Sequence, residues 1–306
     1  MVDDLSQATV VLVGPGRAGR AFARSWTASG GPIIVAARDA ARANLPGNSL
    51  TGVAARDLDD RGSLDADVLV LAAPDDALAP LAARMSSRGR WRFAFHFSGA
   101  MGSRVLAPLA TSGAVLGSLH PLRAFTGLRE DDWRGAFVAV EGEPAAQDAA
   151  EVICRRIGAR PHRIPAAGKP LYHLAATLAA GGTASLLSLA VRAWSDAGLD
   201  EEEGRVALAG LAATAVEAVG RLPFDEALTG PVARRDVATV RLHSEALAGR
   251  PELFALYAVL AAETLSRTPG RGREDEISEI LGIPAATGGE GPEGSEKKSH
   301  TLGPKR

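Results

Sequence analysis

The first half of the chain alternates short apolar runs with segments of helical character. Each run has four or five residues, is rich in Val, Ile, Ala or Phe, and lies near Gly or Pro, as is typical of buried strands. The runs are Val10–Val13, Ile33–Ala36, Val68–Ala72, Phe93–Phe97, Ala114–Ser118 and Phe137–Val140. Helices are predicted between the early runs, notably at Arg17–Ser29 and Asp75–Arg84. This alternation predicts an α/β domain with a mostly parallel, doubly wound sheet.

The second half has a different pattern, because no convincing strand occurs between Pro170 and about Arg267. Ala- and Leu-rich helical segments are predicted at Leu171–Ala197, Glu201–Arg221, Asp236–Ala248 and Pro251–Arg267. We therefore expect three parts: an α/β domain over residues 1–166, an all-α domain over 167–267, and a tail over 268–306. The tail is rich in Gly, Pro, Glu and Ser, which predicts that it is mostly disordered, with a short helix at Asp275–Leu281.

Composition excludes several classes of protein. The 306 residues include 34 basic and 36 acidic side chains, so the chain has no general attraction to nucleic acid or to an anionic membrane. The single cysteine, Cys154, excludes an intrachain disulfide and a four-cysteine zinc site, and no metal site is predicted. The acidic start lacks the pattern of a signal peptide, so we expect a cytoplasmic protein.

One segment has the length of a membrane span. Leu174–Val191 contains 18 residues without a charge. The segment is mostly Ala, Gly, Ser and Thr, with few large apolar side chains, so we predict a buried helix between the two domains instead of a span.

A glycine-rich turn follows the first apolar run directly. Its six residues, Gly14, Pro15, Gly16, Arg17, Ala18 and Gly19, match the G-x-G-x-x-G pattern between a strand and a helix. In a dinucleotide-binding site, Gly14 permits the tight turn, Gly16 lets the backbone approach a pyrophosphate, and Gly19 lets the helix pack on the strand. The helix N-terminus then faces the phosphates. The alternative is a purely structural glycine turn.

The tip of the second run indicates which dinucleotide is bound. NAD-selective sites usually place a carboxylate there, whereas this chain has Ala37 followed by Arg38. An arginine can pair with a 2′-phosphate, so NADP is predicted. The alternative is that Asp39 holds a ribose hydroxyl. Ala73 and Pro74, after the third run, are predicted to line the same site.

Polar clusters at the ends of later runs are candidates for chemistry. His96 lies near the end of the fourth run, Ser98 directly follows that run, and His120 follows the fifth. For each histidine, both a structural role and a catalytic role remain open interpretations. Ser98 either hydrogen-bonds a substrate or terminates a strand.

Lys169 is the strongest candidate for catalysis. Of the 34 basic residues only four are Lys, and the other three lie in the final ten residues. Pro170 predicts that a helix begins at Lys169, where the helix dipole lowers the pKa of an ammonium group. His173 follows at i+4 and shares roughly the same face, or else it is a helix-packing residue.

Five ordered motifs together resemble one family. They are Gly14–Gly19, His96–Ala100, Gly117–Phe125, Lys169–Ala175, and Gly230–Asp236 with His243 and Tyr257. The pattern resembles the Rossmann-like NADP-dependent oxidoreductases related to pyrroline-5-carboxylate reductase, whose C-terminal domain is of unknown function. The resemblance implies a Rossmann domain, a helical domain like that of 6-phosphogluconate dehydrogenase, and a homodimer formed through the helices.

The chain also departs from its more distant relatives. β-Hydroxyacid dehydrogenases and ketopantoate reductases place an Asn four residues after the Lys, where this chain has His173. The family also usually has a Ser-Asn pair in the region where this chain has Gly181 and Gly182.

The leading hypothesis is an NADPH-dependent reductase of a small carbonyl or imine compound, with Lys169 polarising the substrate and His173 assisting. A 2-oxo acid, such as a ketopantoate-like substrate, fits if Arg123, Arg234 or Arg235 binds a carboxylate. The alternative is a non-catalytic NADP-binding sensor or assembly protein.

Overall fold

The computed structural model describes residue 5 and residues 7–38, 53–60, 62–127 and 131–284 of the chain. The chain divides into two compact units, Met1–Thr183 and Ala184–Arg306. The predicted boundary at residue 166 places the first long helix in the second domain, whereas the start of that helix belongs to the first unit.

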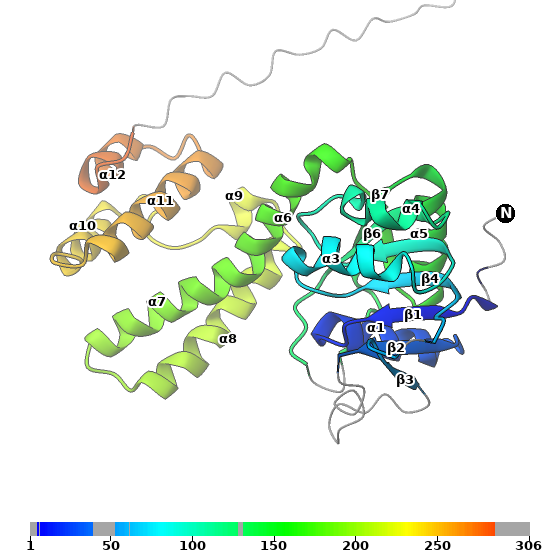
Figure 1. The fold of residues 1–306 in the computed structure, drawn as a ribbon. Helices are drawn as coiled ribbons and strands as arrows, with labels where there is room; N and C mark the ends of the chain where they lie inside the picture. Colours follow the sequence, from blue (N-terminus) through cyan, green and yellow to red (C-terminus); the bar gives the residue numbers. More distant parts are fainter. Residues whose placement is uncertain (1–4, 6, 39–52, 61, 128–130, 285–306) are drawn as a thin grey trace, which may run out of the picture. The chain divides into compact units, whose positions relative to one another are not determined.

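The first unit contains an eight-stranded sheet in the order β3-β2-β1-β4-β5-β6-β7-β8 (Figure 1). All neighbouring strands are parallel except β6 and β7. The strands are β1 (Val10–Val13), β2 (Ile33–Ala37), β3 (Ala54–Asp57), β4 (Ala66–Leu71), β5 (Trp91–His96), β6 (Val115–Leu122), β7 (Phe137–Gly142) and β8 (Arg160–Arg163). The prediction of a mostly parallel sheet is confirmed.

The pattern of apolar runs found the six inner strands and missed the two at the edges. β3 and β8 read Ala-Ala-Arg-Asp and Arg-Pro-His-Arg, and most of their side chains are exposed or half-buried. Edge strands are short and polar in many proteins because their free backbone groups would otherwise pair with another chain. The apolar-run criterion therefore does not detect them.

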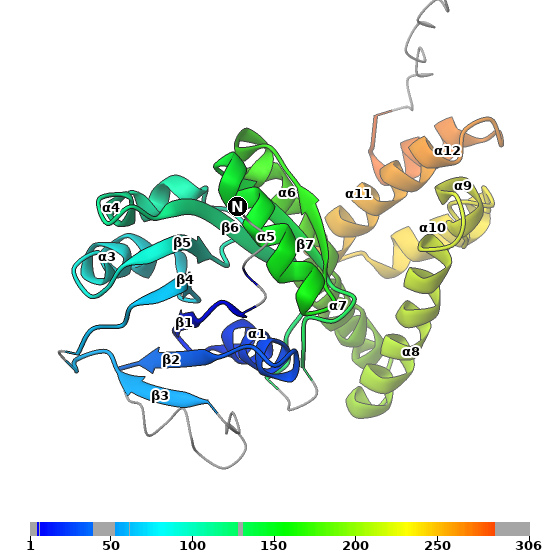
Figure 2. The same cartoon turned by 90° about the vertical axis from the view of Figure 1, so that its right-hand side faces the viewer.

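Both faces of the sheet are covered by helices (Figure 2). α1 (Arg17–Ala28) and α5 (Pro144–Arg156) pack on one face, where Val10 and Leu12 of β1 join the core of Phe22, Trp26 and Ile153. α3 (Asp75–Met85) and α4 (Ala107–Ala110) pack on the other face, which receives Val11 and Val13. Successive strand residues point to opposite faces, so one continuous apolar run serves two cores.

A long helical segment leaves the sheet domain. It comprises a 3₁₀ turn (Ala166–Gly168), α6 (Lys169–Thr177), a π-helical turn η4 (Leu178–Gly182) and α7 (Thr183–Asp196). The pattern predicted one helix over this region and did not predict the π turn, which contains Gly181 and Gly182.

The second unit is helical, as predicted. Its helices after α7 are α8 (Glu201–Val219), α9 (Phe224–Ala227), α10 (Val237–Ala246), α11 (Pro251–Arg267) and α12 (Glu274–Leu281). Ile277 and Leu281 of α12 are buried against Val240 and Ala261 in one core. The short helix predicted in the tail is therefore confirmed and belongs to the folded unit, while residues 285–306 lie outside the described residues.

The segment Ala166–Asp196 is long and apolar enough to cross a membrane, by length and composition alone, and it is the one such helix in the described part of the chain. None of its most apolar 18-residue window is buried. The prediction that this charge-free run is a buried helix is therefore wrong for the single chain. Leu171, Leu174 and Leu178 expose 73%, 51% and 62% of their surface. An exposed apolar face of this kind is typical of an interaction surface.

The three glycines of the β1–α1 turn meet different surroundings. Gly14 has φ +91°, and a Cβ there would lie 2.5 Å from the carbonyl oxygen of Ala72. A Cβ at Gly19 would lie 2.6 Å from the carbonyl oxygen of Gly14, whereas a Cβ at Gly16 would meet nothing within 4 Å. Gly14 and Gly19 thus allow close packing of the turn, and Gly16 leaves open space in front of the helix.

This difference predicts that two matched substitutions change the stability by different amounts. Gly19→Ala should lower the free energy of unfolding by about 1–3 kcal/mol, because the new methyl group collides with backbone. Gly16→Ala should change it by less than about 0.5 kcal/mol. Urea unfolding followed by circular dichroism measures both, and an equal loss in the two variants would contradict the packing role of Gly19.

Candidate active site

A cavity of about 990 Å³ lies at the carboxyl ends of β1, β2 and β4. Open α/β sheets bind ligands at this edge. Gly14 and Gly16 form one part of its wall, and Ala73 and Pro74 form another. The other lining residues are Val13, Pro15, Arg20, Ala37, Arg38, Leu58, Ala72, Ala77, Pro80, Leu81 and Arg84.

The charged groups of this cavity are all basic among the described residues. Arg20, Arg38 and Arg84 line it, and no Asp or Glu does. Arg38 is exposed directly after β2, at the position that sequence analysis assigned to a 2′-phosphate. Asp39, the alternative ribose ligand, lies outside the described residues. Arg84 already forms an ion pair with Asp59 at 2.6 Å. The basic lining suits an anionic ligand.

Three residues of the predicted cofactor motif do not line the cavity. Gly19 packs against Gly14, the carbonyl oxygen of Ala18 accepts a hydrogen bond from Trp133 Nε1 at 3.3 Å, and the Arg17 side chain extends toward Gly127. These contacts follow from the helical turn, which directs successive residues of α1 to different sides. Arg20, one turn beyond Gly16, lines the cavity and was not predicted.

A second cavity, of about 670 Å³, lies where β6 meets α6. His120, Tyr172 and His173 form its polar wall. The rest of its lining is mostly small and apolar: Pro121, Leu122, Arg123, Ala124, Ala175, Ala176, Thr177, Ala179, Ala180 and Gly181. We call it the histidine cavity. The π turn contributes Ala179, Ala180 and Gly181 to it.

His120 and Tyr172 are joined by a hydrogen bond of 2.9 Å between Nδ1 and the phenol oxygen. Burial lowers the pKa of His120 to about 4, with further lowering by His173 and Lys169. Burial also raises the pKa of Tyr172 to about 12. At neutral pH the pair is therefore an uncharged imidazole beside a protonated phenol. Such a pair can donate hydrogen bonds to a substrate oxygen or nitrogen.

His173 lies beside His120, with the ring centroids 5.5 Å apart and the rings nearly perpendicular. A side chain at Gly99 would collide with both imidazoles. The Nδ1 atom of His173 is buried without a hydrogen-bond partner among the described residues. The loop after β5, strand β6 and the first turns of α6 thus bring Gly99, His120 and His173 together.

Lys169 is fully enclosed and is not among the residues that line the histidine cavity. Its Nζ donates to the carbonyl oxygen of Ser98 at 3.1 Å and to the Ser118 hydroxyl at 2.9 Å. The pKa of Lys169 falls to about 8 because of burial, while Glu141 and Asp75 oppose the fall. The sequence argument attributed a lowered pKa to the helix dipole, whereas burial is the cause found in the structure. The predicted direct contact of Lys169 with a substrate does not fit this enclosure.

One register row places three polar side chains on neighbouring strands. His96 of β5 is opposite Ser118 of β6, and Ser118 is opposite Glu141 of β7. The Ser118 hydroxyl donates to Glu141 Oε2 at 3.1 Å. Ser103 donates to the same carboxylate through its backbone N–H at 2.8 Å and through its hydroxyl at 2.9 Å. Because Lys169 also donates to Ser118, its hydrogen bonds are linked through Ser118 to Glu141 on the next strand.

His96 and Ser98 stabilise the loop behind the histidine cavity. His96 is fully buried, and burial with the neighbouring Lys169 lowers its pKa to about 3. The backbone N–H of Ser98 donates to His96 Nδ1 at 3.1 Å, so the proton of this neutral imidazole is on Nε2. The Ser98 hydroxyl accepts from the backbone N–H of Met101 at 2.9 Å. Neither side chain lines the two cavities described above.

The three arginines considered for a substrate carboxylate have different environments. Arg235 exposes only 4% of its surface, and its guanidinium donates to the carbonyl oxygen of Val232 at 2.9 Å and to Glu274 at 3.0 Å. These contacts make Arg235 a structural residue of the second unit. Arg234 is exposed in that unit. Arg123 lines the histidine cavity, but its guanidinium donates to the carbonyl oxygen of Arg134 at 3.1 Å.

Sequence reasoning missed Tyr172, Ser118, Ser103 and Glu141. Tyr172 and Ser118 were inside quoted motifs, next to residues that were singled out. Glu141 directly follows the apolar run Phe137–Val140, and a carboxylate at the end of a buried strand is itself a signal of a buried partner. Ser103 carried no signal, because only the fold brings it to Glu141.

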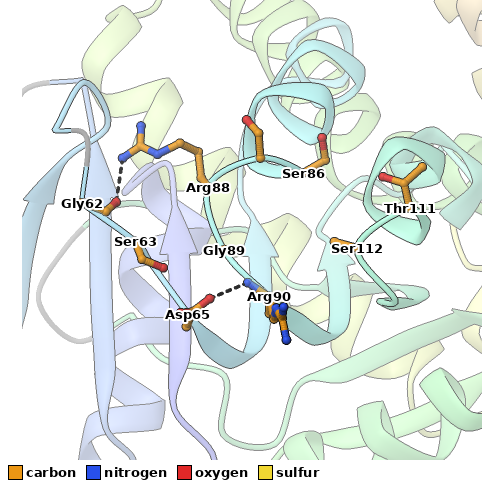
Figure 3. Close-up of a pocket in the computed structure, with 10 residues that line it drawn as sticks. Gly62, Ser63, Asp65, Ser86, Arg88, Gly89, Arg90, Thr111 and Ser112 are labelled. Atoms are coloured by element: carbon orange, nitrogen blue, oxygen red, sulfur yellow. Dashed lines mark hydrogen bonds between the residues drawn. The ribbon is translucent and has the colours of Figure 1, made fainter.

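A further hollow lies at the opposite edge of the sheet, beside the amino ends of β4 and β5 (Figure 3). Asp65 accepts a hydrogen bond of 2.7 Å from the backbone N–H of Arg90 there. The hydroxyls of Ser86, Thr111 and Ser112 donate to carbonyl oxygens three residues earlier in the chain. These local hydrogen bonds stabilise the ends of helices and loops, so the candidate active site is not placed at this edge of the sheet.

Two family models match the chain. Residues 3–121 match a Rossmann-like domain, and residues 136–264 match a domain of unknown function, DUF2520. Together these ranges include both the glycine turn and the helix that begins at Lys169. A comparison with curated proteins gives no match.

Solved structures share the fold across most of the chain. Protein TM1727 from Thermotoga maritima is 23% identical, with a TM-score of 0.65 over 83% of this chain and 97% of that one. A putative NADP oxidoreductase from Bacteroides fragilis is 21% identical, with a TM-score of 0.68 over 85% and 99%. The pyrroline carboxylate reductase of Plasmodium falciparum, solved with NADP bound, is 10% identical, with a TM-score of 0.54 over 86% and 99%. At these identities the similarity establishes the fold. The chain therefore combines a region that matches a Rossmann-like domain with a following region that matches DUF2520.

Proposed function

We propose that this protein is an NADPH-dependent reductase of a small carbonyl or imine compound. The observation that carries the proposal is the pair of cavities on the first unit. One is a basic cavity at the glycine turn, and the other has a wall of hydrogen-bonding groups, His120, Tyr172 and His173. The first suits a dinucleotide phosphate, and the second suits a polar substrate group on an otherwise apolar body.

The residues of the glycine turn fit NADPH. The open space at Gly16 admits a pyrophosphate beside the N-terminus of α1, whose backbone N–H groups attract anions. Arg38, with Arg20 in the same lining, is placed to pair with a 2′-phosphate. When bound, NADPH supplies a hydride, and the protein supplies position and charge.

The polar wall of the histidine cavity binds and orients the substrate in this proposal. The Tyr172 phenol keeps its proton at physiological pH and donates it to the substrate oxygen or nitrogen, with His120 as its hydrogen-bond partner. His173 provides a second hydrogen-bonding group beside it. The small residues of the π turn leave room for the apolar part of the substrate.

Lys169 acts from behind this wall. Its ammonium group lies close enough to His120 to lower the pKa of that imidazole, although the two are not hydrogen-bonded. A positive charge in an enclosed site stabilises negative charge that develops on a substrate oxygen nearby. We therefore assign Lys169 a positioning and electrostatic role.

The structural neighbours support the same class of reaction. The Bacteroides fragilis protein is described as a putative NADP oxidoreductase, and the Plasmodium falciparum enzyme is a pyrroline carboxylate reductase with NADP bound. Both share the arrangement of a Rossmann sheet followed by helices. The substrate of the present chain is to be found among small ketones, 2-oxo acids and cyclic imines.

Substitution of Arg38 tests the choice of cofactor. Arg38→Ala should raise the dissociation constant of NADPH by about 10- to 150-fold, because a charge-assisted hydrogen bond contributes about 1.5–3 kcal/mol. The dissociation constant of NADH should change by less than about threefold, since NADH lacks the 2′-phosphate. Calorimetric titration of both nucleotides provides the measurement. An unchanged NADPH affinity would exclude Arg38 as the phosphate ligand.

Substitution of Tyr172 tests the polar wall. Tyr172→Phe should lower kcat for NADPH oxidation by about 10²- to 10⁴-fold with a turned-over ketone, 2-oxo acid or imine, because the proton donor is lost. Its affinity for NADPH should stay at the wild-type value, since Tyr172 is absent from the lining of the glycine-turn cavity. If wild-type protein binds NADPH but oxidises it with no member of the panel, the sensor function replaces the enzyme.

We further propose that two copies associate through the apolar face of α6 and the π turn that follows it. On α6 and the following π turn this face exposes Leu171, Leu174 and Leu178. A second copy would cover this surface in a cytoplasmic protein, with no need for lipid or nucleic acid.

Leu178→Glu should convert the dimer to a monomer of 31.6 kDa, because a carboxylate on the apolar face opposes burial. The matched variant Leu178→Met keeps the apolar surface and should remain dimeric. Light scattering after size-exclusion chromatography distinguishes the two masses. A monomeric wild-type protein, or recovery of the protein with membranes, would contradict the proposed dimer.

A further inference from the structure

The network of Lys169, Ser118, Glu141 and Ser103 lines neither the glycine-turn cavity nor the histidine cavity. Lys169, Ser118 and Glu141 are each at least 95% buried, and Ser103 exposes 7%. An ammonium group in such surroundings is costly unless an opposite charge or hydrogen bonds compensate for the lost water. The enclosed ammonium group of Lys169 therefore needs a compensating partner.

The hydrogen bonds point to Glu141. Lys169 Nζ donates to the Ser118 hydroxyl, and the Ser118 hydroxyl donates in turn to Glu141 Oε2. The hydroxyl is thus a bridge between the cation and the carboxylate. Ser103 supplies two further donors, one to each carboxylate oxygen.

The other charged and titratable groups around Lys169 do not replace Glu141. His96 of β5 and His120 of β6 are neutral, since their pKa values are lowered to about 3 and about 4. Asp75, at the start of α3, also attracts the ammonium group but is exposed to solvent, where its field is screened. Glu141 of β7 is the buried carboxylate of the set.

The same network attaches α6 to the sheet. Lys169 is the first residue of α6, and its ammonium group reaches the loop after β5 through the Ser98 carbonyl oxygen and reaches β6 through Ser118. Tyr172 and His173 follow within the next turn and face His120, which lies two residues after Ser118 on β6. The position of the cation therefore determines the position of the polar wall.

We propose that Glu141 is the counter-ion of Lys169: acting through Ser118, it keeps the enclosed ammonium group charged and thereby holds Tyr172 and His173 against His120. Glu141 and Ser118 are positioning residues in this assignment. The inference rests on the proposed function only for the importance of the polar wall, and its test uses neither NADPH nor a substrate.

Because the chain has four lysines, the titration of Lys169 can be followed directly by NMR. Protein labelled with ¹³C and ¹⁵N in lysine contains four labelled residues, and Lys169→Met identifies the Lys169 signal by its loss. A pH titration of that signal by NMR should have a midpoint near 8 in the wild type. Glu141→Gln should lower the midpoint by about one pH unit or more, because the opposite charge is removed. Ser118→Ala should lower it by a smaller amount.

Glu143→Gln is the matched control. Glu143 lies two residues from Glu141 and accepts a hydrogen bond of 2.9 Å from the backbone N–H of Leu116 instead of from the network. Its substitution should leave the Lys169 midpoint within about 0.3 units of the wild-type value, a change of less than about twofold in the acid dissociation constant. An unchanged midpoint in folded Glu141→Gln, or equal shifts in Glu141→Gln and Glu143→Gln, would overturn the proposal.

A second readout tests the positioning role. The chain has two tyrosines, so tyrosine-labelled protein gives one set of ring signals for Tyr172 and one for Tyr257. Glu141→Gln and Lys169→Met should shift the Tyr172 signals and leave those of Tyr257 unchanged. If Glu141→Gln does not fold, Ser118→Ala provides the same two measurements. Loss of NADPH turnover without these shifts would count against the positioning role alone and leave the proposed function intact.

Discussion

The arrangement of the candidate site depends on one charge held inside the protein. The ammonium group of Lys169 is removed from water and compensated by the Ser98 carbonyl oxygen and the Ser118 hydroxyl. Because leaving such a group without partners costs several kcal/mol, the helix that carries Lys169 has little freedom to move away from the sheet. The polar wall follows from this constraint, since Tyr172 and His173 are within four residues of the lysine.

The sheet supplies the other part of the constraint. Parallel strands β1, β2, β4, β5 and β6 bring their carboxyl ends to one edge, where the glycine turn, the Ser98–Gly99 loop and His120 lie. The reversal of direction between β6 and β7 is what aligns Glu141 with Ser118. A parallel β7 would change this pairing. The single antiparallel pair thus has a direct effect on the charge balance of the site.

The chemistry assigned to the two cavities is different in kind. At the glycine turn, basic side chains and backbone N–H groups attract anions, and the described lining offers no opposing carboxylate. At the histidine cavity, burial keeps the His120 imidazole and the Tyr172 phenol uncharged, so recognition there depends on hydrogen bonds and on small apolar residues. A charged cofactor and a less polar substrate are the natural occupants of such a pair.

The sequence by itself determined the six inner strands, the main helices, the glycine turn and Arg38, because each is encoded in a short segment whose periodicity or residue order is local. It also singled out Lys169, His120 and His173, through motif context and the scarcity of lysine. It did not reveal the edge strands β3 and β8, whose polar residues resemble loops, or the exposure of the charge-free helix. Only the tertiary structure decided that Lys169 is enclosed and paired through Ser118 with Glu141, because those contacts join residues 23 to 71 positions apart across strands whose order and direction no local pattern specifies.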